Sequence, residues 1–153
     1  MRASRMFTAL AVTAAAGVAC KDNVTGIPAG LEVYTATLNG ANEAPTPVTT
    51  TATGTAIVTV LGNLVSWKVD ILTPIDSIIL GHIHRRAADS VAGNVRVDFA
   101  PTPRGIGFTG TATVGSATVV DSILVIMRDG RGYVNIHTKK NPGGEIRGTL
   151  VKQ

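Results

Sequence analysis

The chain has 153 residues, of which 44% are hydrophobic, 16% charged and 4% aromatic, and its net charge is +4. This length fits one domain with a buried core and is too short for two. The small basic excess is scattered, with no aromatic residues among it to stack on bases, which excludes a nucleic-acid partner. Abundant Thr, Val, Gly and Ala favour short strands joined by turns, so we expect an all-β domain.

The N-terminus has the layout of a secretory signal, residues 1–19. A short basic segment, residues 1–5, precedes an uncharged apolar run over residues 6–19 that ends in small residues. That run is too short and too rich in alanine for a membrane span, which needs about 20 strongly apolar residues. We expect cleavage before Cys20 and a mature domain outside the cytoplasm. Loss of Arg2 and Arg5 with the signal lowers the net charge from +4 to +2.

Cys20, the one cysteine of the chain, follows directly after this run. The sequence GVAC followed by KDN resembles the lipobox of bacterial lipoproteins. The resemblance implies that Cys20 is lipidated and anchors the mature protein in membrane lipid at the cell envelope. Plain cleavage near the same point is the alternative and would give a secreted protein. In either case we expect a flexible spacer over residues 20–30 and one domain without disulfides over residues 31–153.

Alternating β-rich segments follow one another along this domain. Strands are predicted over residues 31–40, 53–61, 64–72, 78–85, 94–100, 108–115, 132–138 and 144–151. The second and third strands turn at Gly62 and Asn63, and the last two form another hairpin. The inner face of the first strand is ambiguous, because both of its faces carry apolar residues.

Residues 121–129 interrupt the rhythm of strands. Asp121 can cap a helix there, Gly130 can end it, and apolar residues between them have helical spacing. We expect a short helix, with a strand as the alternative. About eight strands at this spacing predict an antiparallel Greek-key β-sandwich or barrel.

The three histidines all lie in two of the predicted strands. Alternate residues of a strand share a face, so His82 and His84 project together. His137 shares the outer face of the last hairpin, where it is predicted to lie opposite Glu145. The opposite, apolar faces carry Ile83, Val134, Ile136, Ile146 and Leu150. Because a sandwich needs one apolar face per sheet, we expect the histidines to lie outside the core.

A metal is one explanation of this clustering. Two histidines at i and i+2 with a third distant in sequence suit copper or zinc, so His82, His84 and His137 are candidate ligands. Glu145 is a candidate fourth ligand, or a group that orients a ligand. The alternative is a hydrogen-bonded polar cluster that binds nothing, in which Arg147 pairs with Glu145. No nucleophile with a base and no paired carboxylates occur, so no catalytic residue is predicted.

Three separated motifs occur in a fixed order: EAP at residues 43–45, HIH at residues 82–84, and YVNIHT with GGEIRG within residues 133–148. Together they resemble the CHRD domain family, which is widespread in bacterial exported proteins. The resemblance covers residues 33–150 and implies a β-rich extracellular module with no established reaction. Arg85 and Arg86 depart from the family, which commonly has small residues after HIH.

Within the last motif, the resemblance marks Asn135, Glu145 and Arg147 as family residues. A weaker resemblance is to copper/zinc superoxide dismutase, also a Greek-key barrel with an H-x-H copper pair, and it implies a copper site at the three histidines. The chain lacks the bridging histidine and the zinc-ligand cluster of that enzyme.

Three functional classes remain. The first is a non-catalytic binding or structural module at the envelope, with an unknown extracellular protein partner. The second is a copper- or zinc-binding protein, and the third is an oxidoreductase of superoxide dismutase type. The sequence favours a role without catalysis, since it contains no catalytic constellation.

Overall fold

The computed structural model describes residues 29–88 and 90–153. The expectations for the signal, for Cys20 and for all but the end of the spacer lie outside the described residues. Among the described residues, no helix is long and apolar enough to cross a membrane.

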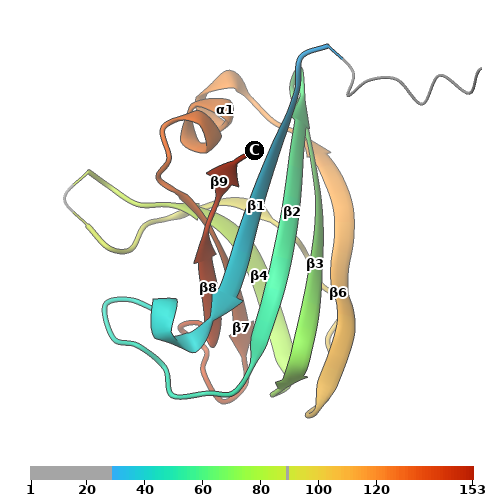
Figure 1. Ribbon diagram of the computed structural model, residues 1–153, viewed down its shortest axis with the longest axis vertical. Coiled ribbons are helices and arrows are strands. Elements are labelled where there is room, and N and C mark those ends of the chain that lie inside the picture. The colour runs from blue at the N-terminus through green and yellow to red at the C-terminus, as the bar shows by residue number, and fades with distance from the viewer. Residues whose placement is uncertain (1–28, 89) are drawn as a thin grey trace, which may run out of the picture.

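The domain is a nearly closed antiparallel β-barrel with one short α-helix (Figure 1). Its elements are β1 (Leu31–Asn39), the 3-10 turn η1 (Gly40–Asn42), β2 (Thr53–Leu61), β3 (Leu64–Ile75), β4 (Ile78–Arg85), β5 (Val95–Asp98), β6 (Phe108–Thr118), α1 (Asp121–Arg128), β7 (Gly132–Thr138), β8 (Ile146–Thr149) and β9 (Val151–Lys152). The strands are hydrogen-bonded in the order β5-β4-β7-β8-β1-β2-β3-β6, and the short β9 pairs with β1. The all-β prediction is therefore confirmed.

Three connections along this order join strands that are not neighbours in the sheet: β3 to β4, β5 to β6 and β6 to β7. The first brings β4, which carries two of the histidines, to the strand that carries the third. The third contains α1, which lies at one end of the barrel (Figure 1). These crossovers, rather than any local turn, bring β4 and β7 side by side.

The hairpin of β2 and β3 turns where the sequence predicted. Leu61 pairs with Leu64, and Gly62 has a φ of 57°, in the left-handed region that favours glycine. The last predicted hairpin, β7 with β8, is also formed, and Asn135 pairs with Arg147 in it.

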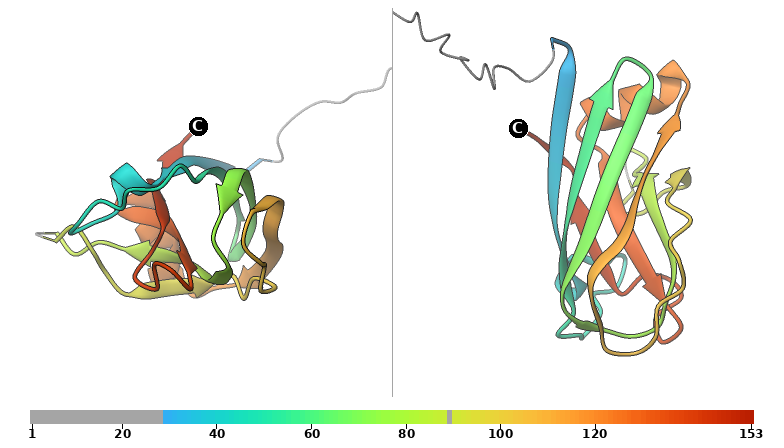
Figure 2. Two further views of the ribbon diagram at one scale, coloured as in Figure 1. Left: turned by 90° about the horizontal axis from the view of Figure 1, so that it is seen from below. Right: turned by 90° about the vertical axis from the view of Figure 1, so that its right-hand side faces the viewer.

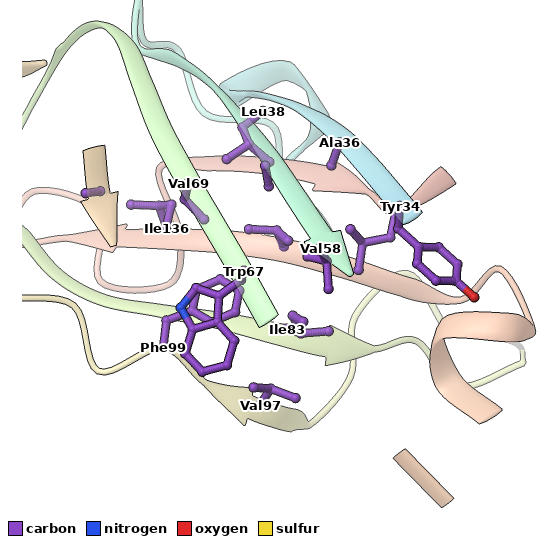
Figure 3. Packing of buried hydrophobic residues seen from close by; sticks show 14 of the residues in the cluster. Tyr34, Ala36, Leu38, Val58, Trp67, Val69, Ile83, Val97, Phe99 and Ile136 are labelled. Atoms are coloured by element: carbon purple, nitrogen blue, oxygen red, sulfur yellow. The ribbon is translucent and has the colours of Figure 1, made fainter. Parts of the chain in front are cut away.

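The barrel encloses one hydrophobic core. The ambiguous first strand turns Tyr34, Ala36 and Leu38 inward, where they are buried (Figure 3). Trp67 stacks on Phe99 with ring centroids 5.0 Å apart, which places the one tryptophan in the core. Burial of these large apolar groups is the main stabilising contribution to such a fold.

The short helix is confirmed, but its cap differs from the prediction. Val120 occupies the N-cap position and makes no side-chain capping bond, while Asp121 is the first helical residue. The Asp121 carboxylate instead accepts a hydrogen bond of 2.9 Å from the Asn63 side chain. Gly130, with a φ of 69°, follows the end of the helix.

The predicted faces of the site strands are correct, although the outer face is not exposed to solvent. The predicted apolar residues all lie in the core: Ile83, Val134, Ile136, Ile146 and Leu150. Their outward neighbours are also buried: His82, His84, Tyr133, Asn135, His137 and Arg147. The β1–β2 connection and the β4–β5 connection extend on the same side of the barrel in Figure 1 and in the left-hand view of Figure 2.

Candidate metal centre

The outer faces of β4, β7 and β8 carry a layer of buried polar side chains, here called the polar layer. Its members are His82, His84, Tyr133, Asn135, His137 and Arg147, together with Glu43 from the β1–β2 connection. The β1–β2 and β4–β5 connections are hydrogen-bonded to this layer. The Asn135 amide donates to Glu43 at 3.3 Å, and the Gly93 amide donates to the Tyr133 hydroxyl at 3.2 Å. The layer is therefore enclosed between the sheet and its loops.

The three histidines converge within this layer. His82 pairs with Asn135 across β4 and β7, so His137, two residues along β7, lies diagonally beside it. His82 Nδ1 is 3.1 Å from His137 Nε2. One ring nitrogen from each of the three residues can be chosen so that all lie within 4.8 Å of one another.

The nitrogens that point away from this convergence are anchored to oxygen atoms. His84 Nδ1 is 2.9 Å from the Gly93 carbonyl oxygen, and His137 Nδ1 is 2.9 Å from that of Pro142. A carbonyl oxygen only accepts, so both Nδ1 atoms carry the hydrogen and both Nε2 atoms present a lone pair. This is the arrangement by which metal-binding imidazoles are usually oriented.

His82 differs because its Nδ1 faces the lone pair of His137 Nε2. Without an ion, His82 Nδ1 must carry the hydrogen and donate it. Its other nitrogen, Nε2, is 3.8 Å from the Asp98 carboxylate. Transfer of the hydrogen to Nε2, next to Asp98, would free Nδ1 as a ligand without changing the charge of the ring.

Burial keeps the three rings neutral. It lowers the pKa of His84 to about 4, and it also lowers the pKa of His82 and of His137. The charge of the Asp98 carboxylate acts to raise the pKa of His82, but burial has the larger effect. Neutral imidazole is the ligand form, so protons do not compete for these nitrogens near neutral pH.

The size of the cluster suits one ion after a small contraction. An ion with metal–nitrogen bonds of about 2.0–2.1 Å in tetrahedral geometry holds its nitrogens roughly 3.3 Å apart. The His82–His137 pair, at 3.1 Å, already has this spacing. The His84 ring must move inward, and its Nε2 is buried without a hydrogen-bond partner among the described residues.

Glu145 does not join the three histidines. Its carboxylate accepts hydrogen bonds from Thr50 at 2.8 Å and from Thr138 at 2.6 Å. The ladder of β7 and β8 ends at Ile136, whose carbonyl accepts from the Glu145 amide, so the predicted position opposite His137 is not formed. Glu145 therefore orders the hairpin turn.

Arg147 does not pair with Glu145 either, among the contacts of the described residues. Its guanidinium donates to the Val91 carbonyl oxygen and lies over the Tyr133 ring, with Cζ 3.6 Å from the centroid. Tyr133 stacks on His84 at 5.0 Å on its other side. Arg147 thus belongs to the same polar layer as the histidines.

Sequence reasoning missed two members of the layer. Glu43 is buried, and burial raises the pKa of its carboxyl to about 7, although Arg147 and the Asn135 hydrogen bond act to lower it. Glu43 is the first residue of the EAP motif, which indicates the family resemblance but not a buried position beside the histidines. Tyr133 is an outward neighbour of Val134 on β7, and nothing in the sequence indicates that its ring lies between His84 and Arg147.

The family model described as CHRD domain matches residues 34–150, most of the chain, and the chain belongs to this family. The resemblance seen in the three motifs is therefore confirmed. The family suggests a β-module of a non-enzymatic type. No curated protein and no solved structure matches the chain, so the comparison with copper/zinc superoxide dismutase rests on the H-x-H motif and the barrel alone.

Proposed function

We propose that this CHRD-domain protein is a binding module that holds one copper or zinc ion in its polar layer. The ligands are His82 Nδ1, His84 Nε2 and His137 Nε2. The observation that carries the proposal is the convergence of three buried histidines within 4.8 Å while their remaining nitrogens face oxygen atoms. Copper binds more tightly than zinc to a given nitrogen site, so copper is the ion expected to be held when both are present.

The competing interpretation is a polar cluster that only stabilises the loops. It leaves the His84 Nε2 lone pair buried without a partner, a state that costs about 1–3 kcal/mol. An ion would satisfy that lone pair and would replace the contact between His82 and His137 with two metal bonds. The metal interpretation therefore gives the His84 Nε2 atom a partner, which the polar-cluster interpretation does not.

We also propose where the module acts. The signal-like residues 1–19 and the lipobox-like sequence at Cys20 support export and attachment to membrane lipid at the bacterial envelope. The spacer over residues 20–30 would hold the barrel away from the lipid surface, where it can meet an extracellular partner.

The metal proposal is tested on protein purified without a histidine tag. Metal content by mass spectrometry, followed by titration of the chelator-stripped protein with Cu²⁺ and Zn²⁺, should give about one ion per chain. The variant His137→Gln should lose at least the tenfold to hundredfold in affinity typical of changing a group that merely orients a ligand.

Glu145→Gln is the matched control, because Glu145 is a buried polar residue of the same hairpin but does not point into the cluster. It should keep the stoichiometry and the affinity once circular dichroism shows that it is folded. Unchanged binding in His137→Gln, or equal loss in both variants, contradicts the proposal.

A further inference from the structure

A second site lies on the outer surface next to the polar layer. A groove of about 550 Å³ runs between β1, the ends of β8 and β9, and the β4–β5 connection. Its lining includes three threonines and Asn42, together with the guanidinium-bearing residues Arg86 and Arg147. No acidic side chain lines it among the residues that the structure describes.

Arg147 brings a buried positive charge to this groove, and no carboxylate of the described residues lies within ion-pair distance of it, although the buried Glu43 carboxyl is close enough to act on its pKa. Only 5% of the residue is exposed, and among the described residues its guanidinium forms no ion pair. A guanidinium has five N–H donors, while the contacts of the Arg147 guanidinium with the described part of the chain are one carbonyl oxygen and the face of the Tyr133 ring. A buried charge of this kind is stable only when a counter-charge and further hydrogen bonds are supplied.

Arg86 has unused donors as well. Its Nε is buried and has no hydrogen-bond partner within the described part of the chain. Its Nη2 donates to the Gly130 carbonyl at 3.4 Å, a long and weak contact. Two guanidinium groups whose donors are not all used by residues 29–88 and 90–153 therefore line one groove. Arg85, the residue next to Arg86, is instead paired with Asp129 at 2.8 Å.

The planar guanidinium groups and the volume of the groove favour an organic carboxylate over an inorganic anion. A planar guanidinium matches a carboxylate through two parallel hydrogen bonds. The volume of about 550 Å³ lies in the range of small-molecule sites and exceeds what a bare inorganic ion fills. Hydroxyl groups of Thr35, Thr37 and Thr149 can bond to the polar substituents of a larger organic acid.

We propose that this groove binds an organic carboxylate, held by Arg147 and Arg86. The carboxylate belongs to a small organic acid or to the C-terminus of a peptide, since both present the same group. The proposal does not depend on the metal, because neither arginine is a ligand of the histidine cluster.

The test is a calorimetric titration of the chelator-treated protein with succinate. Saturable binding is expected, and Arg86→Gln should weaken it by roughly tenfold to a hundredfold, the effect of losing a charge-assisted hydrogen bond. Arg147→Gln should weaken it similarly if the variant folds, but Arg86→Gln alone decides the question. The matched control is Arg96→Gln, which removes the same charge from an exposed position outside the groove and should change the affinity less than about twofold.

Two further probes identify the chemistry and its source. Inorganic phosphate should bind more weakly than succinate, and equal binding overturns the assignment to carboxylates. A peptide that binds more tightly with a free C-terminus than with an amidated one, and more tightly than succinate, identifies a peptide as the source. The opposite order identifies a small acid. Absence of saturation up to about 10 mM succinate, or equal loss in Arg86→Gln and Arg96→Gln, refutes the site.

Discussion

The substitution Glu43→Gln tests the electrostatics of the polar layer. Glu43 is 6% exposed, its Oε2 accepts from Asn135, and its Oε1 has no partner among the described residues. Asn135 Oδ1 is likewise buried without a donor. A glutamine can accept the same hydrogen bond and can offer its own amide hydrogen to Asn135 Oδ1.

The raised pKa of Glu43 predicts that Glu43→Gln stabilises the protein. Burial raises the pKa of Glu43 from 4.5 to about 7 in the folded protein, so the unfolded chain ionises first. Below pH 4.5 the Glu43 carboxyl is protonated in both states and does not change the free energy of unfolding. As the pH rises above 4.5, its ionisation in the unfolded chain lowers the free energy of unfolding progressively, and the loss is complete above pH 7. The interval between 4.5 and about 7 corresponds to roughly 3 kcal/mol at about 1.36 kcal/mol per pH unit.

The assay is urea denaturation of the metal-free protein and of Glu43→Gln between pH 5 and 8. The variant should be more stable by roughly 3 kcal/mol at pH 8 and by under 1 kcal/mol at pH 5. Glu32→Gln is the control of opposite sign. Arg128 and Lys152 hold the pKa of Glu32 at about 2, so its ionised form stabilises the fold and the variant should be less stable at pH 5 and above. A stability difference for Glu43→Gln that does not change with pH would refute this reasoning.

The remaining predictions concern binding, packing and location. Copper affinity should persist as the pH falls below 6.5 and should weaken toward the pKa of about 4 of His84, because burial lowers the pKa of the ligands; a titration at each pH that shows loss already at 6.5 contradicts this. Ile136→Ala should lower the free energy of unfolding by roughly 2 to 5 kcal/mol in urea, since Ile136 is fully buried in the core. Gly148→Ala should lower the melting temperature, because an added Cβ would lie only 2.3 Å from the Thr37 carbonyl oxygen, and an unchanged melting temperature would show that β1 yields easily. Cys20→Ser should move the protein from the membrane fraction to the soluble exported fraction, and unchanged detergent partitioning argues against lipidation.

The alternation of apolar and polar residues predicts most of the fold because each strand has a single core-facing side. Ile83 and Ile136 are inward for this reason, and their neighbours His82 and His137 are outward. Alternation does not reveal what covers the outer side. The connections that bury the histidines are irregular, and they are fixed by contacts such as Gly93 with Tyr133 that have no sequence period.

The candidate site was only partly predictable for a topological reason. The spacing of His82 and His84 is local, but their meeting with His137 depends on the register of β4 against β7, two strands joined by crossovers. The predicted place of Glu145 failed because a regular hairpin was assumed. The chain leaves the ladder after Ile136, and the Glu145 carboxylate turns to Thr138 instead.

Tyr133 connects the two proposed sites. Its ring stacks on His84 at an interplanar angle of 7° and carries the Arg147 guanidinium on its other side. The positive charge of Arg147 contributes to lowering the pKa of His84, and by the same Coulombic repulsion it disfavours a metal cation there. A carboxylate bound to Arg147 would offset this repulsion, because it places a negative charge on the far side of the guanidinium. Each ligand would then favour the other, since any coupling between two binding sites is reciprocal.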